Sequence, residues 1–145
     1  MSALTKPRHA RHRSARGVRP AMGCGVDVVE LSRFRQALQR GGEAFIRRVF
    51  TIHETRYARA RRRTTLLHLA GRFAAKEAVM KAIAQLEPQH LLAMNQIEVR
   101  NDRYGRPHIV LHGRRGTWLK PVEVHVSLSH VKSVAVASAI AIRVR

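Results

Sequence analysis

Residues 69–82, LAGRFAAKEAVMKA, decide the fold, because they form the centre of the strongest helical pattern in the chain. Apolar residues recur near helical spacing from position 66 to 84, and alanine and other strong helix formers fill the positions between them. The pattern predicts one long central helix. Glu77 is the only acid in this range, and it stands between Lys76 and Lys81.

Strand patterns lie on both sides of the predicted helix. Residues 23–30 (GCGVDVVE) form a short apolar run, and residues 95–100 and 107–111 read as two strands joined by the reversal NDRYGR. Residues 122–128 alternate apolar and polar side chains, and the apolar run 133–142 completes a final hairpin that turns near residues 130–132. The order predicts an α+β domain with an antiparallel sheet packed on the long central helix.

Shorter helices are expected between the first strand and the central helix. One begins at Leu31 and ends at Gly41-Gly42, because paired glycines commonly stop a helix. Another begins at the capping box Thr51-Ile52-His53-Glu54 and runs to about Arg62. Residues 114–119, which include Trp118, are expected to form a short helix.

The chain is strongly basic. It has 145 residues with 28 Lys and Arg against 9 Asp and Glu, a net charge of +19, and its length suits a single domain over residues 22–145. Residues 1–21 carry six of these cations and no acid, so the remainder still has a net charge of +13. Such a charge favours an anionic partner, which includes nucleic acid, an acidic protein and a phosphate-rich small molecule.

Residues 1–21 are expected to be a disordered basic extension, with Met22 as an alternative start. They lack the apolar region of a secretory signal, and no apolar run in the chain reaches the ~20 residues of a membrane helix. Cys24 is the only cysteine, so no intrachain disulfide can form, and we expect this thiol to pack among apolar neighbours. The composition suits the cytoplasm.

Two acids on different elements could meet where the sheet joins the helix. Asp27 lies inside the first strand, where an isolated charge is costly unless it is paired or binds a metal. Glu77 shares a helical stripe with Lys81, four residues later. Carboxylate oxygens suit Mg²⁺, which fills its other positions with water and substrate phosphates. Four nearby cations would then donate hydrogen bonds to the phosphate oxygens: Arg72, Lys76, Lys81 and His130.

A structural interpretation of the same residues is also open at this point. Glu77 and Lys81 also make an ordinary helix ion pair, which contributes only about 0.2–0.5 kcal/mol. Asp27 could be a satisfied strand carboxylate, and His130 could be structural. From the spacing alone, these two interpretations are not separated.

Five segments, in this order, resemble the short class of 4′-phosphopantetheinyl transferases, the holo-[acyl-carrier-protein] synthases. They are GCGVDVVELSRF, FIRRVFTIHE, LAGRFAAKEAVMKA, IEVRNDRYGRPHIVL and VHVSLSHVKSVAVASAI. The resemblance implies the transferase fold and an enzyme of fatty acid and related lipid biosynthesis. Such an enzyme moves the phosphopantetheine arm of coenzyme A to a serine of an acyl carrier protein and releases adenosine 3′,5′-bisphosphate.

The resemblance also implies catalytic roles. Asp27 and Glu77 would hold Mg²⁺ together with the diphosphate of coenzyme A, while Lys81 and Lys76 would stabilise charge on the leaving bisphosphate. A base must take the serine proton, and either Glu77 or a metal-bound water could do so. Asp27, Glu77 and Lys81 are therefore the expected catalytic residues.

Binding roles follow from the same resemblance. Arg72 and His130 would contact the nucleotide at its 3′-phosphate, and the loop Gly105-Arg106-Pro107 would lie against the adenine. Arg33 would bind the acidic carrier protein, with Arg48 as a further candidate. The short members are homotrimers with sites at subunit boundaries. The alanines of the last strand suit either such a boundary or an ordinary core: Ala135, Ala137, Ala139 and Ala141.

Departures from the family pattern and an alternative function remain. Val131 stands after His130 where many relatives carry threonine, which puts a hydroxyl contact to the nucleotide in doubt. Val29 stands where the two-lobed transferases carry a third acid, which supports the short class. The alternative is a basic nucleic-acid-binding module, against which stand only seven aromatic residues and no stacking motif. The sequence does not name the carrier, which could serve fatty acid, polyketide or peptide synthesis.

Overall fold

The computed structural model describes residues 21–88, 91–112 and 122–144, so the predicted extension and the predicted helix over 114–119 fall outside these ranges apart from Ala21. The N-terminal elements are β1 (Met22–Glu30), α1 (Leu31–Val49), α2 (Ile52–Arg59), the 3₁₀ helix η1 (Arg62–Thr64) and α3 (Thr65–Leu86). They are followed by the 3₁₀ helix η2 (Met94–Gln96), β2 (Ile97–Asn101), β3 (Pro107–Leu111), β4 (Val122–His130) and β5 (Val134–Arg143). No helix within the described ranges is long and apolar enough to cross a membrane.

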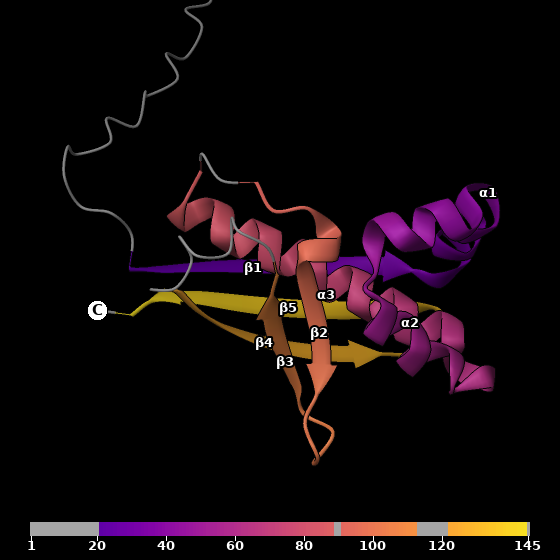
Figure 1. Cartoon of the computed structure of the whole chain (residues 1–145). Helices are drawn as coiled ribbons and strands as arrows, with labels where there is room; N and C mark the ends of the chain where they lie inside the picture. Colours follow the sequence, from indigo (N-terminus) through magenta and orange to yellow (C-terminus); the bar gives the residue numbers. More distant parts are fainter. Residues whose placement is uncertain (1–20, 89–90, 113–121, 145) are drawn as a thin grey trace, which may run out of the picture.

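The strands form two antiparallel sheets. β1, β5 and β4 pair in that order, and β2 and β3 form a separate hairpin. Figure 1 shows this hairpin running across the direction of the three long strands. The α+β class with an antiparallel sheet on the long helix is confirmed, while the expected single sheet is divided into two.

Helix α3 lies close against the three-stranded sheet because the contact is built from small residues. A Cβ atom on Gly23 or Gly25 would lie 2.1 Å from the carbonyl oxygen of Ala82 or Ala78, so only glycine permits this approach. The alanines of β5 face the same helix and are almost fully buried: Ala135, Ala137, Ala139 and Ala141. Their small side chains therefore belong to the core of this chain.

The opposite face of the sheet is mainly apolar on β1 and β5, and none of the described residues covers it there. Val26 and Val28 on β1 are 58% and 63% exposed, and their alternating neighbours point toward α3. Met22, Ile140 and Ile142 extend the same face. Cys24 is exposed here as well, so the expectation that it packs in the core of the chain is wrong, because strand alternation turns it away from α3.

The first helix is interrupted at the paired glycines, as expected. The range of α1 spans two helical segments joined by a kink, where Gly42 adopts the non-helical angles φ 53° and ψ −147°, and the second segment runs to Val49. Glycine allows this left-handed backbone without a Cβ clash, so the chain bends and the helix resumes. The predicted capping box is confirmed: Thr51 and Glu54 each bond the other's backbone amide at the start of α2.

Candidate functional site

A cavity of about 690 Å³ opens between β1, α1 and α3. Its polar walls come from Asp27 on β1, Arg33 on α1 and Glu77 on α3. Its apolar walls include three phenylalanines whose rings pack on one another, Phe34, Phe45 and Phe73. We call this space the carboxylate cavity, and it brings together residues that are far apart in the sequence.

Lys81 is tied directly to Asp27. Its Nζ atom lies 2.8 Å from Asp27 Oδ1 and 2.9 Å from the carbonyl oxygen of Val26. The lysine side chain is half exposed, whereas that of Asp27 is only 18% exposed. The ammonium group is thus anchored at the cavity but keeps access to solvent.

Glu77 and Asp27 are close enough to repel each other. Partial burial raises the pKa of Glu77, the charge of Asp27 raises it further, and Lys81 opposes the change. The pKa of Lys81 is raised in turn, chiefly by its hydrogen bond to Asp27. Among the described residues no group of three or more His, Cys, Asp or Glu is arranged to hold a metal. Glu30 also lines the cavity, but its carboxylate accepts a hydrogen bond from Ser32, so Asp27 and Glu77 are the two carboxylates that the cavity offers a cation.

Lys76 is placed differently from the expectation. It is fully buried on another side of α3, where its Nζ donates to Glu54 Oε2 at 2.6 Å and to the carbonyl oxygens of Val49 and Met94. All three protons of the ammonium group are therefore used. Because no proton of Lys76 is left for a phosphate oxygen, we do not propose Lys76 as a nucleotide-binding residue.

A second group of cations surrounds Tyr57. The guanidinium carbons of Arg61 and Arg72 lie 3.5 and 4.0 Å from the centre of its ring, a distance at which cations attract an aromatic face. The ring of His68 meets Tyr57 edge to face. Burial lowers the pKa of His68, and Arg72, Arg61 and His130 lower it further. Arg72 and His130 thus share one neighbourhood, which we call the Tyr57 cluster.

The Tyr57 cluster and the carboxylate cavity lie on different sides of α3. Arg72 precedes Glu77 by five residues, which turns their side chains about 140° apart around the helix. The expectation that Arg72 stands beside Glu77 is therefore not met within one chain. Sequence distance along the helix was short, but the rotation per residue separates the two groups.

The loop Gly105-Arg106-Pro107 closes the β2–β3 hairpin and is held by Asp102. The Asp102 carboxylate accepts hydrogen bonds from the backbone amides of Tyr104 and Arg106 and from the Arg106 side chain. Gly105 has φ 82°, a conformation that suits glycine. These bonds fix the loop backbone and leave the arginine head groups at the surface.

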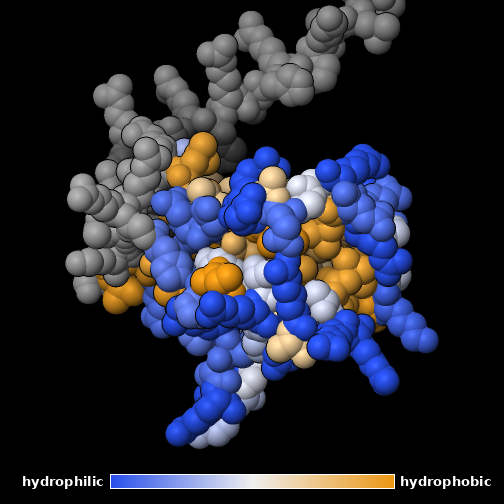
Figure 2. Space-filling model, turned by 45° about the vertical axis from the view of Figure 1, so that its right-hand side comes forward, coloured by the Kyte–Doolittle hydropathy of each residue, from blue (hydrophilic) through white to orange (hydrophobic). Residues whose placement is uncertain are grey.

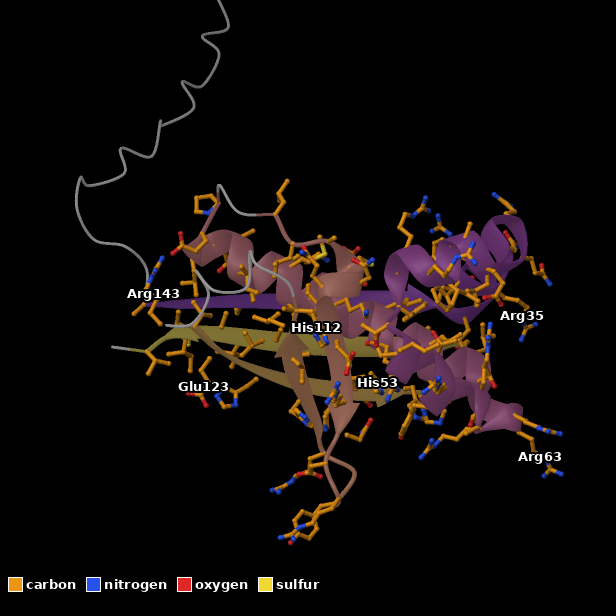
Figure 3. All side chains as sticks on the ribbon, in the orientation of Figure 1. Arg35, His53, Arg63, His112, Glu123 and Arg143 are labelled. Carbon is orange, nitrogen blue, oxygen red and sulfur yellow. The ribbon has the colours of Figure 1, made fainter. Side chains whose placement is uncertain are left out.

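Basic side chains cover the helical end of the molecule. Arg33 lines the carboxylate cavity, and the Arg48 guanidinium lies 5.8 Å from the ring centre of Phe45, another wall of that cavity. Arg35 and Arg63 extend outward at this end in Figure 3. Figure 2, which turns the same end toward the viewer, shows an apolar area framed by hydrophilic side chains.

Three residues escaped the sequence analysis as parts of a site. Glu54 was recognised only as a helix cap, although it also holds Lys76. Tyr57 and Asn101 contact Arg72 from α2 and β2. No local pattern indicates these contacts, since each partner lies on a different element.

Comparison with known proteins gives consistent matches. Residues 23–139 match the family model described as ACPS, the 4′-phosphopantetheinyl transferase superfamily. A holo-[acyl-carrier-protein] synthase of Nocardia farcinica is 41% identical over 80% of this chain and 83% of its own. Two solved structures from Chronobacterium ammoniagenes are also similar. The ACPS–CoA complex has a TM-score of 0.74 at 35% identity, covering 87% of this chain and 100% of that one. The apo-ACPS has a TM-score of 0.76 at 36% identity, covering 86% and 99%.

Proposed function

Because the chain belongs to the 4′-phosphopantetheinyl transferase superfamily, we propose that it is a holo-[acyl-carrier-protein] synthase. It transfers the 4′-phosphopantetheine group of coenzyme A to a serine of an apo acyl carrier protein and releases adenosine 3′,5′-bisphosphate. The observation that carries this proposal is the meeting of Asp27, Glu77 and Lys81 at one cavity. No observation favours the nucleic-acid alternative.

Mg²⁺ is the proposed metal, with Asp27 and Glu77 as its protein ligands. Mg²⁺ typically takes one or two carboxylates and completes its shell with water and substrate phosphates, which suits a site of two acids. Burial and then repulsion by Asp27 raise the pKa of Glu77, and a cation between the two carboxylates would relieve the repulsion. When bound, the metal supplies positive charge to the diphosphate of coenzyme A.

The protein side chains supply the remaining chemistry. Lys81, anchored at Asp27 but half exposed, stabilises negative charge on the leaving bisphosphate. Phenylalanine side chains line part of the carboxylate cavity, and such apolar walls strengthen charge interactions beside them because they are poorly polarisable. Two groups can take the proton of the attacking serine, Glu77 and a water molecule beside it.

The nucleotide is proposed to lie between two copies of the chain. Arg72 and His130 meet its 3′-phosphate, and residues 105–107 lie against the adenine. Because the Tyr57 cluster and the carboxylate cavity face different sides of α3, a cavity of one copy and the cluster of another together complete a site. A homotrimer fits this arrangement, and the apolar outer face of β1 and β5 is the surface that the copies cover.

The carrier protein is proposed to dock on the basic helical end. Acyl carrier proteins are acidic, so Arg33 and Arg48 on α1 would steer and orient them next to the cavity. Arg33 is the stronger of the two candidates, because it lines the space in which the serine must react.

Intact-mass spectrometry tests the proposal. A panel of apo carrier proteins is incubated with coenzyme A, Mg²⁺ and the protein, and at least one carrier should gain one phosphopantetheine group. Chelation of the metal should abolish the gain, and Asp27→Ala and Glu77→Ala should nearly abolish it. Glu43→Ala, an exposed acid outside the cavity, is the matched control and should remain active. If no carrier gains mass with the wild-type protein, the proposal is wrong.

A further inference from the structure

Asn101, the last residue of β2, bonds in two directions with one side chain. Its Oδ1 accepts a hydrogen bond from Arg72 Nη2 at 2.8 Å, and its Nδ2 donates to the carbonyl oxygen of Gly105 at 2.8 Å. The first bond reaches α3 and the second reaches the hairpin loop. The side-chain amide of Asn101 therefore connects α3 to the β2–β3 loop, which are far apart in the sequence.

Arg72 depends on its neighbours for its direction. Its side chain is only 4% exposed, its guanidinium lies against the Tyr57 ring, and Nη1 reaches the carbonyl oxygen of His68 at a long 3.4 Å. Its Nε is buried without a hydrogen-bond partner among the described residues. A planar guanidinium recognises an anion only when its fork points correctly. The short hydrogen bond to Asn101 therefore sets the direction of the Arg72 guanidinium.

The hairpin loop has its own support but no other described side-chain bond to α3. Asp102 organises the backbone of the loop from within, as its bonds to Tyr104 and Arg106 show. A cavity of about 250 Å³ lies where the hairpin meets α2 and α3, and Arg72 and Asn101 both line it. The position of the loop relative to Arg72 is therefore set at Asn101.

We propose that Asn101 is a positioning residue that fixes the direction of the Arg72 guanidinium for its contact with the 3′-phosphate of the nucleotide. The inference rests on the proposed function, in which Arg72 meets the 3′-phosphate and residues 105–107 meet the base. Asn101 acts through Arg72, so its contribution is specific to nucleotides that carry the 3′-phosphate. It thereby contributes to the selection of coenzyme A over 3′-dephospho-coenzyme A.

Steady-state transfer to an apo carrier protein, with each of these two substrates, tests the inference. Asn101→Ala should raise KM for coenzyme A about tenfold with a small change in kcat, because a bond to a charged group is lost. KM for 3′-dephospho-coenzyme A should change by less than about twofold, since Arg72 has no phosphate to meet. Asn95→Ala, an exposed asparagine on η2, is the matched control and should behave as wild type.

Two further variants separate positioning from folding. In Arg72→Ala/Asn101→Ala the second substitution should add nothing to the first for coenzyme A, because coupled residues are not additive. Asn101→Asp keeps the acceptor for Arg72 but loses the donor to Gly105 and places a negative charge beside the phosphate. It should raise KM for coenzyme A at least as much and still spare the dephospho substrate.

Several outcomes would overturn the inference. One is an equal rise in KM for both substrates, which indicates general distortion, and another is full additivity in the double variant. The inference is also overturned if Arg72→Ala leaves the ratio of KM for 3′-dephospho-coenzyme A to KM for coenzyme A at its wild-type value, because Asn101 would then have no phosphate contact to position. Absence of any transfer by the wild-type protein is a separate result, which contradicts the proposed function instead.

Discussion

Replacing Lys76 by methionine should destabilise the fold and should affect coenzyme A binding only through that loss. Lys76 and Glu54 are both fully buried, and their ion pair is 2.6 Å long. Burial lowers the pKa of Lys76 and Glu54 opposes this change, so the cation depends on its partner. Without the lysine, the Glu54 carboxylate keeps as donors, within the described ranges, only the backbone amides of Thr51 and Val99.

Breaking a buried pair by removing one partner costs about 3–5 kcal/mol, because the other charge stays buried. The carbonyl oxygens of Val49 and Met94 lose their donor at the same time. At the slope typical of a chain of this size, the melting temperature should fall by roughly 6–20 °C. Circular dichroism melts at one protein concentration measure this change, since assembly would make the midpoint depend on concentration.

The double variant Glu54→Gln/Lys76→Met removes both charges and keeps an acceptor for one of the two amides. Its loss of stability should be smaller than the sum of the losses in Glu54→Gln and Lys76→Met, which measures the coupling of the pair. The reasoning is refuted if Lys76→Met melts like the wild type while KM for coenzyme A rises. That result would return Lys76 to the phosphate-binding set.

Four further predictions concern other parts of the molecule. Gly25→Ala should lower the free energy of unfolding by about 1–3 kcal/mol and slow transfer, because its Cβ would lie 2.1 Å from the carbonyl oxygen of Ala78. Gly71→Ala is the control and should melt no lower than wild type, because the nearest contact of its Cβ is 3.4 Å away. The pKa of His68 is lowered in the fold from its ordinary 6.5 by burial and by Arg72, so stability should fall as pH drops below 6.5 toward the folded value; His68→Gln should lose that part of the slope in melts between pH 8 and 5. Arg33→Glu should raise KM for the carrier in initial-rate assays and leave KM for coenzyme A nearly unchanged, and an equal rise in both would contradict carrier docking at this arginine. Val28→Asp, on the uncovered sheet face, should dissociate the proposed trimer in sedimentation velocity, whereas Glu123→Gln, a polar position on the same face, should not.

Local patterns predicted most of the fold. The helix formers around Glu77, the capping box at Thr51 and the alternation along residues 122–128 each correspond to a local free-energy preference, and each matches an element of the structure. The paired glycines correctly indicated an interruption at Gly42, but they did not indicate the second helical segment that follows it to Val49. The β2–β3 hairpin was predicted, but its separation from the three-stranded sheet was not, since strand patterns do not state which sheet a strand joins.

The candidate site was predictable only as a set of residue types. Asp27, Glu77 and Lys81 meet as their spacing and the family resemblance suggested. The sequence could not show that Lys76, the immediate neighbour of Glu77, turns about 100° away into a buried ion pair. Nor could it show the contacts of Asn101, because both of its partners are fixed by tertiary structure.

The glycine contacts between β1 and α3 have a consequence for how the proposed metal site can vary. The spacing between Asp27 and Glu77 is set by two backbones that touch, and a peptide backbone has no rotamers through which to adjust. A methyl group at Gly25 would therefore push β1 and α3 apart and change the distance between the two carboxylates. Either carboxylate can be exchanged for another acid by a single substitution, but the distance between them is set by the fold.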